Sequence, residues 1–135
     1  MKITEHCLEP GETRSLTIWA KEKNSSNQLV VEPGQTYQFT VSPNDKWFDM
    51  GWPTNANGFN NVVLQWSRHK PRVEWAKCFA LCAVLNKNDA TAFVVGTKTR
   101  TTFPEGGVLS FFANDAPDYY FNNFGKITVE VLRVT

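Results

Sequence analysis

Long apolar runs and an excess of charge of one sign are both missing from this sequence of 135 residues. No apolar run approaches the roughly 18–20 residues that a membrane span requires, so no membrane span is expected. Lys and Arg together number 14 and Asp and Glu 13, which leaves a formal net charge of +1. Proteins that neutralise phosphates usually carry a basic excess or stripe, so no nucleic-acid partner is expected.

The N-terminal residues 1–6 lack the apolar stretch of a secretory signal. A soluble protein is therefore expected, either cytoplasmic or exported by a route that needs no signal peptide. With 41% hydrophobic residues, the chain has enough apolar side chains for one compact domain over residues 1–135.

Cysteine is scarce, and its spacing matches no zinc motif. Cys78 and Cys82 lie in the apolar run 78–85, which is typical of a buried strand. At about 3.3 Å per residue their Cα atoms lie roughly 13 Å apart, too far for a mutual disulfide. Both are expected to be buried thiols, while a disulfide of either with Cys7 depends on the tertiary structure.

Catalytic motifs are missing as well. The sequence has two histidines, no Gly-x-Ser-x-Gly elbow, no phosphate-binding glycine loop and no dinucleotide fingerprint. We therefore expect no enzymatic activity. A glycosidase with paired carboxylates stays the third possibility, because such pairs meet in space rather than in sequence.

What the sequence does contain is a series of short apolar or alternating segments separated by Gly, Pro and Asn. This pattern predicts an antiparallel β-sandwich or barrel. The region 42–61 is rich in Asn, Pro and Trp and is expected to be a long functional loop. The eight predicted strands are Ser15–Trp19, Leu29–Val31, Tyr37–Val41, Val62–Trp66, Phe79–Leu85, Ala92–Val95, Val108–Ala113 and Ile127–Val134.

One polar segment, residues 114–125, lies between the last two predicted strands. It holds two carboxylates and three side-chain amides within ten residues. Such hard oxygen donors suit Ca²⁺, which takes about six to eight oxygen ligands, although the spacing is not that of an EF-hand. Asn, Asp, Pro and Gly are also ordinary turn residues, so both interpretations stay open.

The run Gly107–Asp115, followed by Asn122-Asn123-x-Gly125 and the alternating strand Ile127–Val131, resembles the C-terminal part of the PA-I galactophilic lectin family. Pro33-Gly34-Gln35 before Tyr37–Val41 resembles a turn and strand of the same family. These are small calcium-dependent bacterial lectins. The resemblance implies an all-β, antiparallel jelly-roll β-sandwich related to galactose-binding domains.

The resemblance also implies a set of ligands. Asp115 would bind Ca²⁺ through its carboxylate and also accept a sugar hydroxyl. Asn122 and Asn123 would give side-chain oxygens to the metal, with Asn122 also contacting the sugar. Tyr119 falls where the family offers a backbone carbonyl. A further carbonyl comes from the segment 47–50, where either Trp47 or Met50 fits.

The sequence departs from the family on the side that holds the sugar. His69 lies where the family has a sugar-binding histidine, but Arg72 stands in place of the glutamine that follows it. Phe121 replaces a small glycine beside the metal site and is expected to narrow the pocket.

The tryptophans offer rings on which a sugar stacks its C–H face. Trp66 and Trp75 flank predicted strands and are expected in the core. Trp47 and Trp52 lie in the predicted loop near the metal, where core packing and sugar stacking are both open.

These observations lead to calcium-dependent, non-catalytic carbohydrate binding, with galactosides as the implied ligands. The alternative is a structural or interaction module that has lost the sugar site. The sequence leaves open a homo-oligomer.

Overall fold

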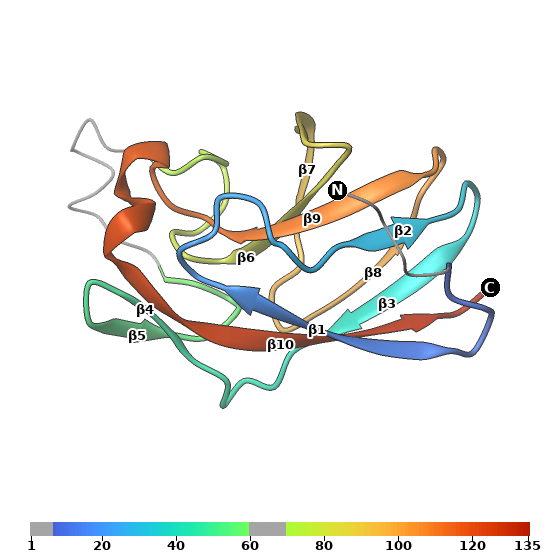
Figure 1. The fold of residues 1–135 in the computed structure, drawn as a ribbon, viewed down its shortest axis with the longest axis horizontal. Coiled ribbons are helices and arrows are strands. Elements are labelled where there is room, and N and C mark those ends of the chain that lie inside the picture. Colours follow the sequence, from blue (N-terminus) through green and yellow to red (C-terminus); the bar gives the residue numbers. More distant parts are fainter. Residues whose placement is uncertain (1–6, 60–69) are drawn as a thin grey trace.

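The structure is a computed structural model that describes residues 7–59 and 70–135. Nearly all of its regular structure is β-strand (Figure 1). In chain order the elements are β1 (Thr13–Trp19), β2 (Leu29–Val31), β3 (Thr36–Thr40), β4 (Trp47–Asp49), β5 (Trp52–Thr54), β6 (Leu81–Leu85), β7 (Asn88–Val94), β8 (Lys98–Thr102), β9 (Gly107–Ala113), the 3₁₀ helix η1 (Pro117–Asn122) and β10 (Asn123–Arg133).

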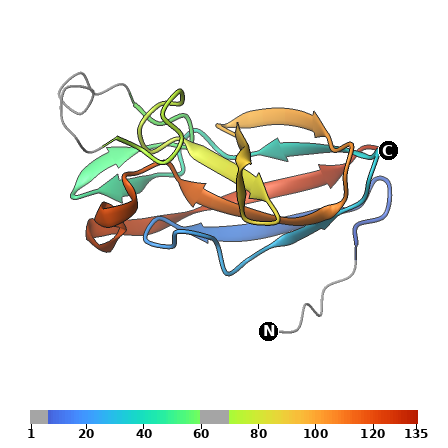
Figure 2. The same cartoon turned by 90° about the horizontal axis from the view of Figure 1, so that it is seen from above.

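The strands form two antiparallel sheets, which confirms the predicted all-β jelly-roll sandwich. One sheet has the order β5-β4-β10-β3-β8, and β1 also pairs with β10. The other has the order β2-β9-β6-β7. The long strand β10 pairs with β4 through residues 123–125, with β1 through residues 126–132 and with β3 through residues 130–133. The helix η1 and the β4–β5 hairpin therefore lie at the same end of the sandwich (Figures 1 and 2).

The core lies between the two sheets. It is formed by alternate side chains of the strands, because successive side chains of a strand point to opposite faces of the sheet. Phe39 of β3 lies edge-on to Phe111 of β9, with ring centroids 6.0 Å apart. Strand β6 is buried along both faces. Leu81, Ala83 and Leu85 belong to the main core, while Cys82 and Val84 join a second apolar cluster. This double burial explains why the apolar run is continuous rather than alternating.

Most of the predicted strands are present, but three strands were missed. The segment Val62–Trp66 lies outside the described residues, and the other seven predicted segments overlap observed strands. The prediction of an irregular loop over 42–61 was wrong, since this region contains the β4–β5 hairpin. Its turn uses Met50 and Gly51, which both have positive φ angles. Strand β8 was also missed.

The segment 72–78 is fixed to the end of β9 by the side chain of Asn114. This amide is fully buried. Its Oδ1 accepts the N–H of Val73 at 2.8 Å, and its Nδ2 donates to the carbonyls of Val73 at 2.9 Å and Lys77 at 3.0 Å. One side chain thus satisfies several backbone groups and holds the second apolar cluster in place.

Asn114→Ala is expected to lower the free energy of unfolding by about 2 to 4 kcal/mol, because it leaves buried backbone groups without partners. Chemical denaturation measures this loss. Asn88→Ala is the control, since its Oδ1 accepts only the exposed N–H of Ala90 and its loss should not exceed about 1 kcal/mol. An Asn114→Ala variant as stable as the wild type would show that this amide does not hold the segment.

Candidate functional site

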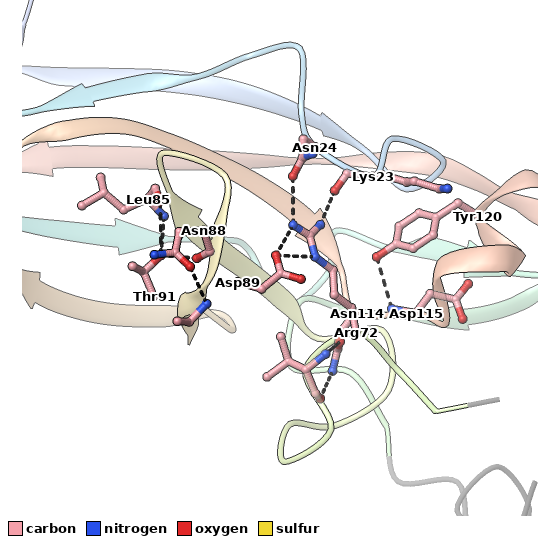
Figure 3. A network of polar contacts seen from close by, with 12 residues as sticks. Lys23, Asn24, Arg72, Leu85, Asn88, Asp89, Thr91, Asn114, Asp115 and Tyr120 are labelled. Atoms are coloured by element: carbon pink, nitrogen blue, oxygen red, sulfur yellow. Dashed lines mark hydrogen bonds and ion pairs between the residues drawn. The ribbon is translucent and has the colours of Figure 1, made fainter. Parts of the chain in front are cut away.

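The candidate site lies where β9 ends, around Asp115. The Asp115 carbonyl accepts the N–H of Arg72 at 3.0 Å, and its N–H donates to the Tyr120 hydroxyl at 3.4 Å. Figure 3 shows the contact between Tyr120 and Asp115. The Tyr120 ring is buried, and its hydroxyl also donates to the carbonyl of Ala113. Helix η1 is therefore fastened back onto β9, and Asp115 is held from two sides.

The second part of the site is the pairing of β4 with the start of β10. Phe48 lies opposite Phe124, and their rings stack with centroids 4.8 Å apart. Because side chains alternate along a strand, Asp49 and Asn123, which are also paired, share the opposite face of the sheet. Directly paired residues have Cβ atoms about 4.5–5.5 Å apart. The register thus sets the Asp49 carboxylate beside the Asn123 amide.

Gly125 explains the last position of the Asn-Asn-x-Gly motif. Its φ of +88° lies in the left-handed region that favours glycine. A Cβ there would come within 3.2 Å of the Phe48 ring and 3.3 Å of the Trp47 Cα. Glycine therefore allows β4 to approach β10 beside the site.

Three buried oxygens at this place have no hydrogen-bond partner within the described residues: Asp115 Oδ2, Asn122 Oδ1 and Asn123 Oδ1. Asn123 is only 3% exposed. Its Nδ2 donates to the carbonyl of Ala20 at 3.1 Å, which leaves the oxygen unpaired. Asp115 Oδ1, by contrast, accepts the N–H of Ala116 at 2.8 Å. Unpaired buried acceptors are unusual in folded proteins and indicate a missing partner.

Burial and neighbouring carboxylates raise the pKa values of the acidic groups at the site. The pKa of Asp115 is raised to about 6, mainly by burial and in part by the nearby Asp49 carboxylate, while the Ala116 N–H and the Asn123 side chain oppose the shift. Burial also raises the pKa of Asp49. The pKa of the Cys78 thiol is raised by burial first, and then by Asp115 and Asp49.

Sequence reasoning missed Asp49 as a site residue. The signal was present, because strict alternation in Trp47-Phe48-Asp49 predicts that Trp47 and Asp49 share one face. The prediction of a loop over 42–61 conceals this alternation, because residues of a loop have no fixed face. Among the described residues no three His, Cys, Asp or Glu side chains form a metal-binding group. What gathers here is two carboxylates and two amides, all oxygen donors.

The two alternatives for the further backbone ligand lie at different places. The Met50 N–H donates to the carbonyl of Asn122 at 3.3 Å, so the Met50 main chain lies against the site. Trp47 pairs with Gly125, two positions farther along β10. Tyr119 lies inside η1, where its N–H donates to the carbonyl of Ala116 at 2.9 Å. This geometry favours Met50 over Trp47.

The tryptophans are distributed differently from the expectation. Trp47 is fully buried and lies edge-on to Phe79, so it is a core residue and offers no face to a sugar. Trp75 was expected in the core, which is wrong, since it is 71% exposed. Trp52 is 63% exposed on β5. Trp66 and His69 lie outside the described residues.

Arg72 and Phe121 mark the departures from the lectin pattern. The Arg72 guanidinium donates hydrogen bonds to Asp89, Asn24 and the carbonyl of Lys23 (Figure 3). Its central carbon also lies 3.9 Å from the centroid of the Phe112 ring. It is therefore engaged away from the Asp115 carboxylate. Phe121 is 79% exposed, so its ring faces solvent and is not buried in the site.

Comparison with solved structures identifies the fold. Eight chains match. One, described as "EclA N-terminal domain; PllA-like lectin", aligns with a TM-score of 0.61 and 21% sequence identity over 88% of this chain and 94% of that chain. The chain has a lectin-like fold. No family model and no curated protein matches the sequence. Within the described residues, no helix is long and apolar enough to cross a membrane.

The pKa of Asp115 predicts a pH dependence of stability. A native pKa of about 6, above the usual 3.8, means that the native state binds this proton more tightly than the unfolded state. The stability that this proton contributes is full below about pH 4 and is lost as pH rises through about 6. In chelator, Asp115→Asn should therefore unfold like the wild type near pH 4 and be more stable than it at pH 7.

Denaturation midpoints of both proteins between pH 4 and 7 measure this difference. Asp118→Asn, which changes an exposed carboxylate of η1, serves as the control and should leave the pH profile unchanged. A constant difference between Asp115→Asn and the wild type over this range would contradict the shifted pKa.

Proposed function

We propose that this domain binds carbohydrate in a calcium-dependent manner, without catalysing a reaction. The observation that carries the proposal is the set of unpaired buried oxygens on Asp115, Asn122 and Asn123. These are the residues that the resemblance to calcium-dependent lectins singles out. The lectin-like fold and the solved lectin domain that shares it support a carbohydrate as the ligand.

The donor set fits Ca²⁺. Calcium prefers carboxylate, amide and carbonyl oxygens and accepts flexible shells of about six to eight of them. Asp115, Asn122 and Asn123 would supply side-chain oxygens, and the main chains of Met50 and Tyr119 would supply carbonyls. Bound calcium would offer its remaining positions to two neighbouring hydroxyls of a sugar.

The protein's own groups would then fix the sugar. Asp115 would accept a hydrogen bond from a sugar hydroxyl beside the metal, and the Asn122 amide would form a hydrogen bond with another. The exposed ring of Trp52 would stack against the apolar face of the sugar. His69 belongs to the proposed sugar contacts, and galactosides are the first ligands to test.

A second candidate function is a structural or interaction module with the same sandwich and no sugar site. The observation that favours it is Arg72, which stands in place of the family's sugar-binding glutamine. Its guanidinium is engaged by Asp89 and Asn24 rather than turned to the site. Glycan binding by the wild-type protein separates the two candidates.

Calcium should raise the melting temperature of the wild-type protein. A ligand that binds only the native state stabilises it by mass action, by about 2.7 kcal/mol at 100 times Kd. In a domain of this size that corresponds to a rise of several degrees. Differential scanning calorimetry in excess calcium and in chelator measures the rise. Identical melting curves in the two conditions would exclude the calcium site.

Two substitutions should separate metal binding from sugar binding. Asp115→Asn removes the carboxylate that serves both partners, so it should lose calcium binding and glycan binding together. Trp52→Ala removes only a stacking ring, so it should keep the calcium response and lose most of the glycan signal. Calcium titration and a glycan array measure both. Trp75→Ala is a matched control, since Trp75 is comparably exposed and should change neither signal.

If the wild-type protein binds calcium but no glycan at millimolar concentration, the module without a sugar site is the better description. If Asp115→Asn binds calcium as tightly as the wild type, the metal site is misplaced.

A further inference from the structure

Asp49 brings a second carboxylate to the candidate site, from a part of the chain far from Asp115 in sequence. It is the last residue of β4 and is paired with Asn123, the first residue of β10. The stacked rings of Phe48 and Phe124 occupy the outer face of this pair of strands. The side chains of Asp49 and Asn123 therefore point to the inner face, where the Asn123 oxygen is buried and unpaired.

The two carboxylates lie in one another's electrostatic field without a neutralising partner. The Asp49 carboxylate contributes to the raised pKa of Asp115, and both carboxylates raise the pKa of the Cys78 thiol. Within residues 7–59 and 70–135, no Lys or Arg forms a salt bridge with either carboxylate. Two desolvated like charges repel, which is unfavourable unless a cation joins them.

We propose that Asp49 is a second carboxylate ligand of the cation held by Asp115, Asn122 and Asn123. The inference rests on the proposed calcium site and adds to it a charge that the lectin resemblance does not supply. With Asp115 alone, a site holding a divalent cation carries one net positive charge. With Asp49 included, the two carboxylates neutralise the cation.

This neutrality has a consequence for affinity. Calcium sites are tuned by the number of charged ligands, and losing one carboxylate weakens them. The same carboxylate destabilises the protein when no cation is bound, because it repels Asp115. Removing the charge of Asp49 should therefore act in opposite directions with and without calcium, and a purely structural role does not produce this pattern.

Asp49→Asn tests the proposal, with Asp118→Asn as the matched control that removes one exposed negative charge near the site. Calcium affinity is measured by isothermal titration calorimetry and melting temperature by calorimetry in chelator. We expect Asp49→Asn to weaken calcium binding by about tenfold or more. In chelator it should melt at or above the wild-type temperature. Asp118→Asn should match the wild type in both measurements.

Three results would overturn the role of Asp49 and leave the proposed function standing. The first is an unchanged calcium affinity in Asp49→Asn. The second is a loss of glycan binding alone, which would make Asp49 a sugar contact. The third is a melting temperature in chelator below that of the wild type, which would make Asp49 a structural residue. A wild-type protein that shows no calcium binding would overturn both the proposed function and the role of Asp49.

Discussion

The antiparallel pairing of β4 with the first residues of β10 determines where the oxygens of the candidate site lie. Three residue pairs make up this contact. At one end of it, Gly125 lets the strands approach, and the burial of Trp47 against Phe79 fastens β4 to the core. At the other end, Asp49 meets Asn123. A shift of one residue in this register would turn Asp49 outward and bring a Phe48 ring into the site.

The other half of the site depends on backbone groups satisfied by side chains. Asn114 fixes the segment 72–78, and Tyr120 fastens η1 to β9. Asp115 lies between these two anchors. Groups held by neighbours in this way keep one geometry without a ligand present, which is what binding without large rearrangement requires. The connecting segments that form the site are therefore anchored to the sandwich on both sides of Asp115.

The sequence predicts the fold better than it predicts the site. The strands with strict alternation or continuous apolar runs were found, because burial on one or both faces leaves that pattern. Strand β8 was missed because Lys98–Thr102 is polar throughout. The hairpin β4–β5 was missed because its strands are three residues long and one contains Pro53. Asp49 was missed for the same reason, since its place in the site follows from strand register rather than from any local motif.

The asparagines of this chain differ in whether a described residue donates a hydrogen bond to the side-chain oxygen. The side-chain oxygens of Asn57, Asn86, Asn88 and Asn114 each accept a backbone N–H, within a local turn at Asn88 and across distant segments at the other three. The side-chain oxygens of Asn122 and Asn123 are buried, yet they accept nothing from the described residues. Asp115 has one oxygen of each kind, because Oδ1 accepts the N–H of Ala116 and Oδ2 has no partner among the described residues. Backbone hydrogen bonding thus accounts for four asparagine oxygens and one oxygen of Asp115. The remaining oxygens are buried with no donor among the described residues, so a group from outside those residues is needed to compensate their desolvation.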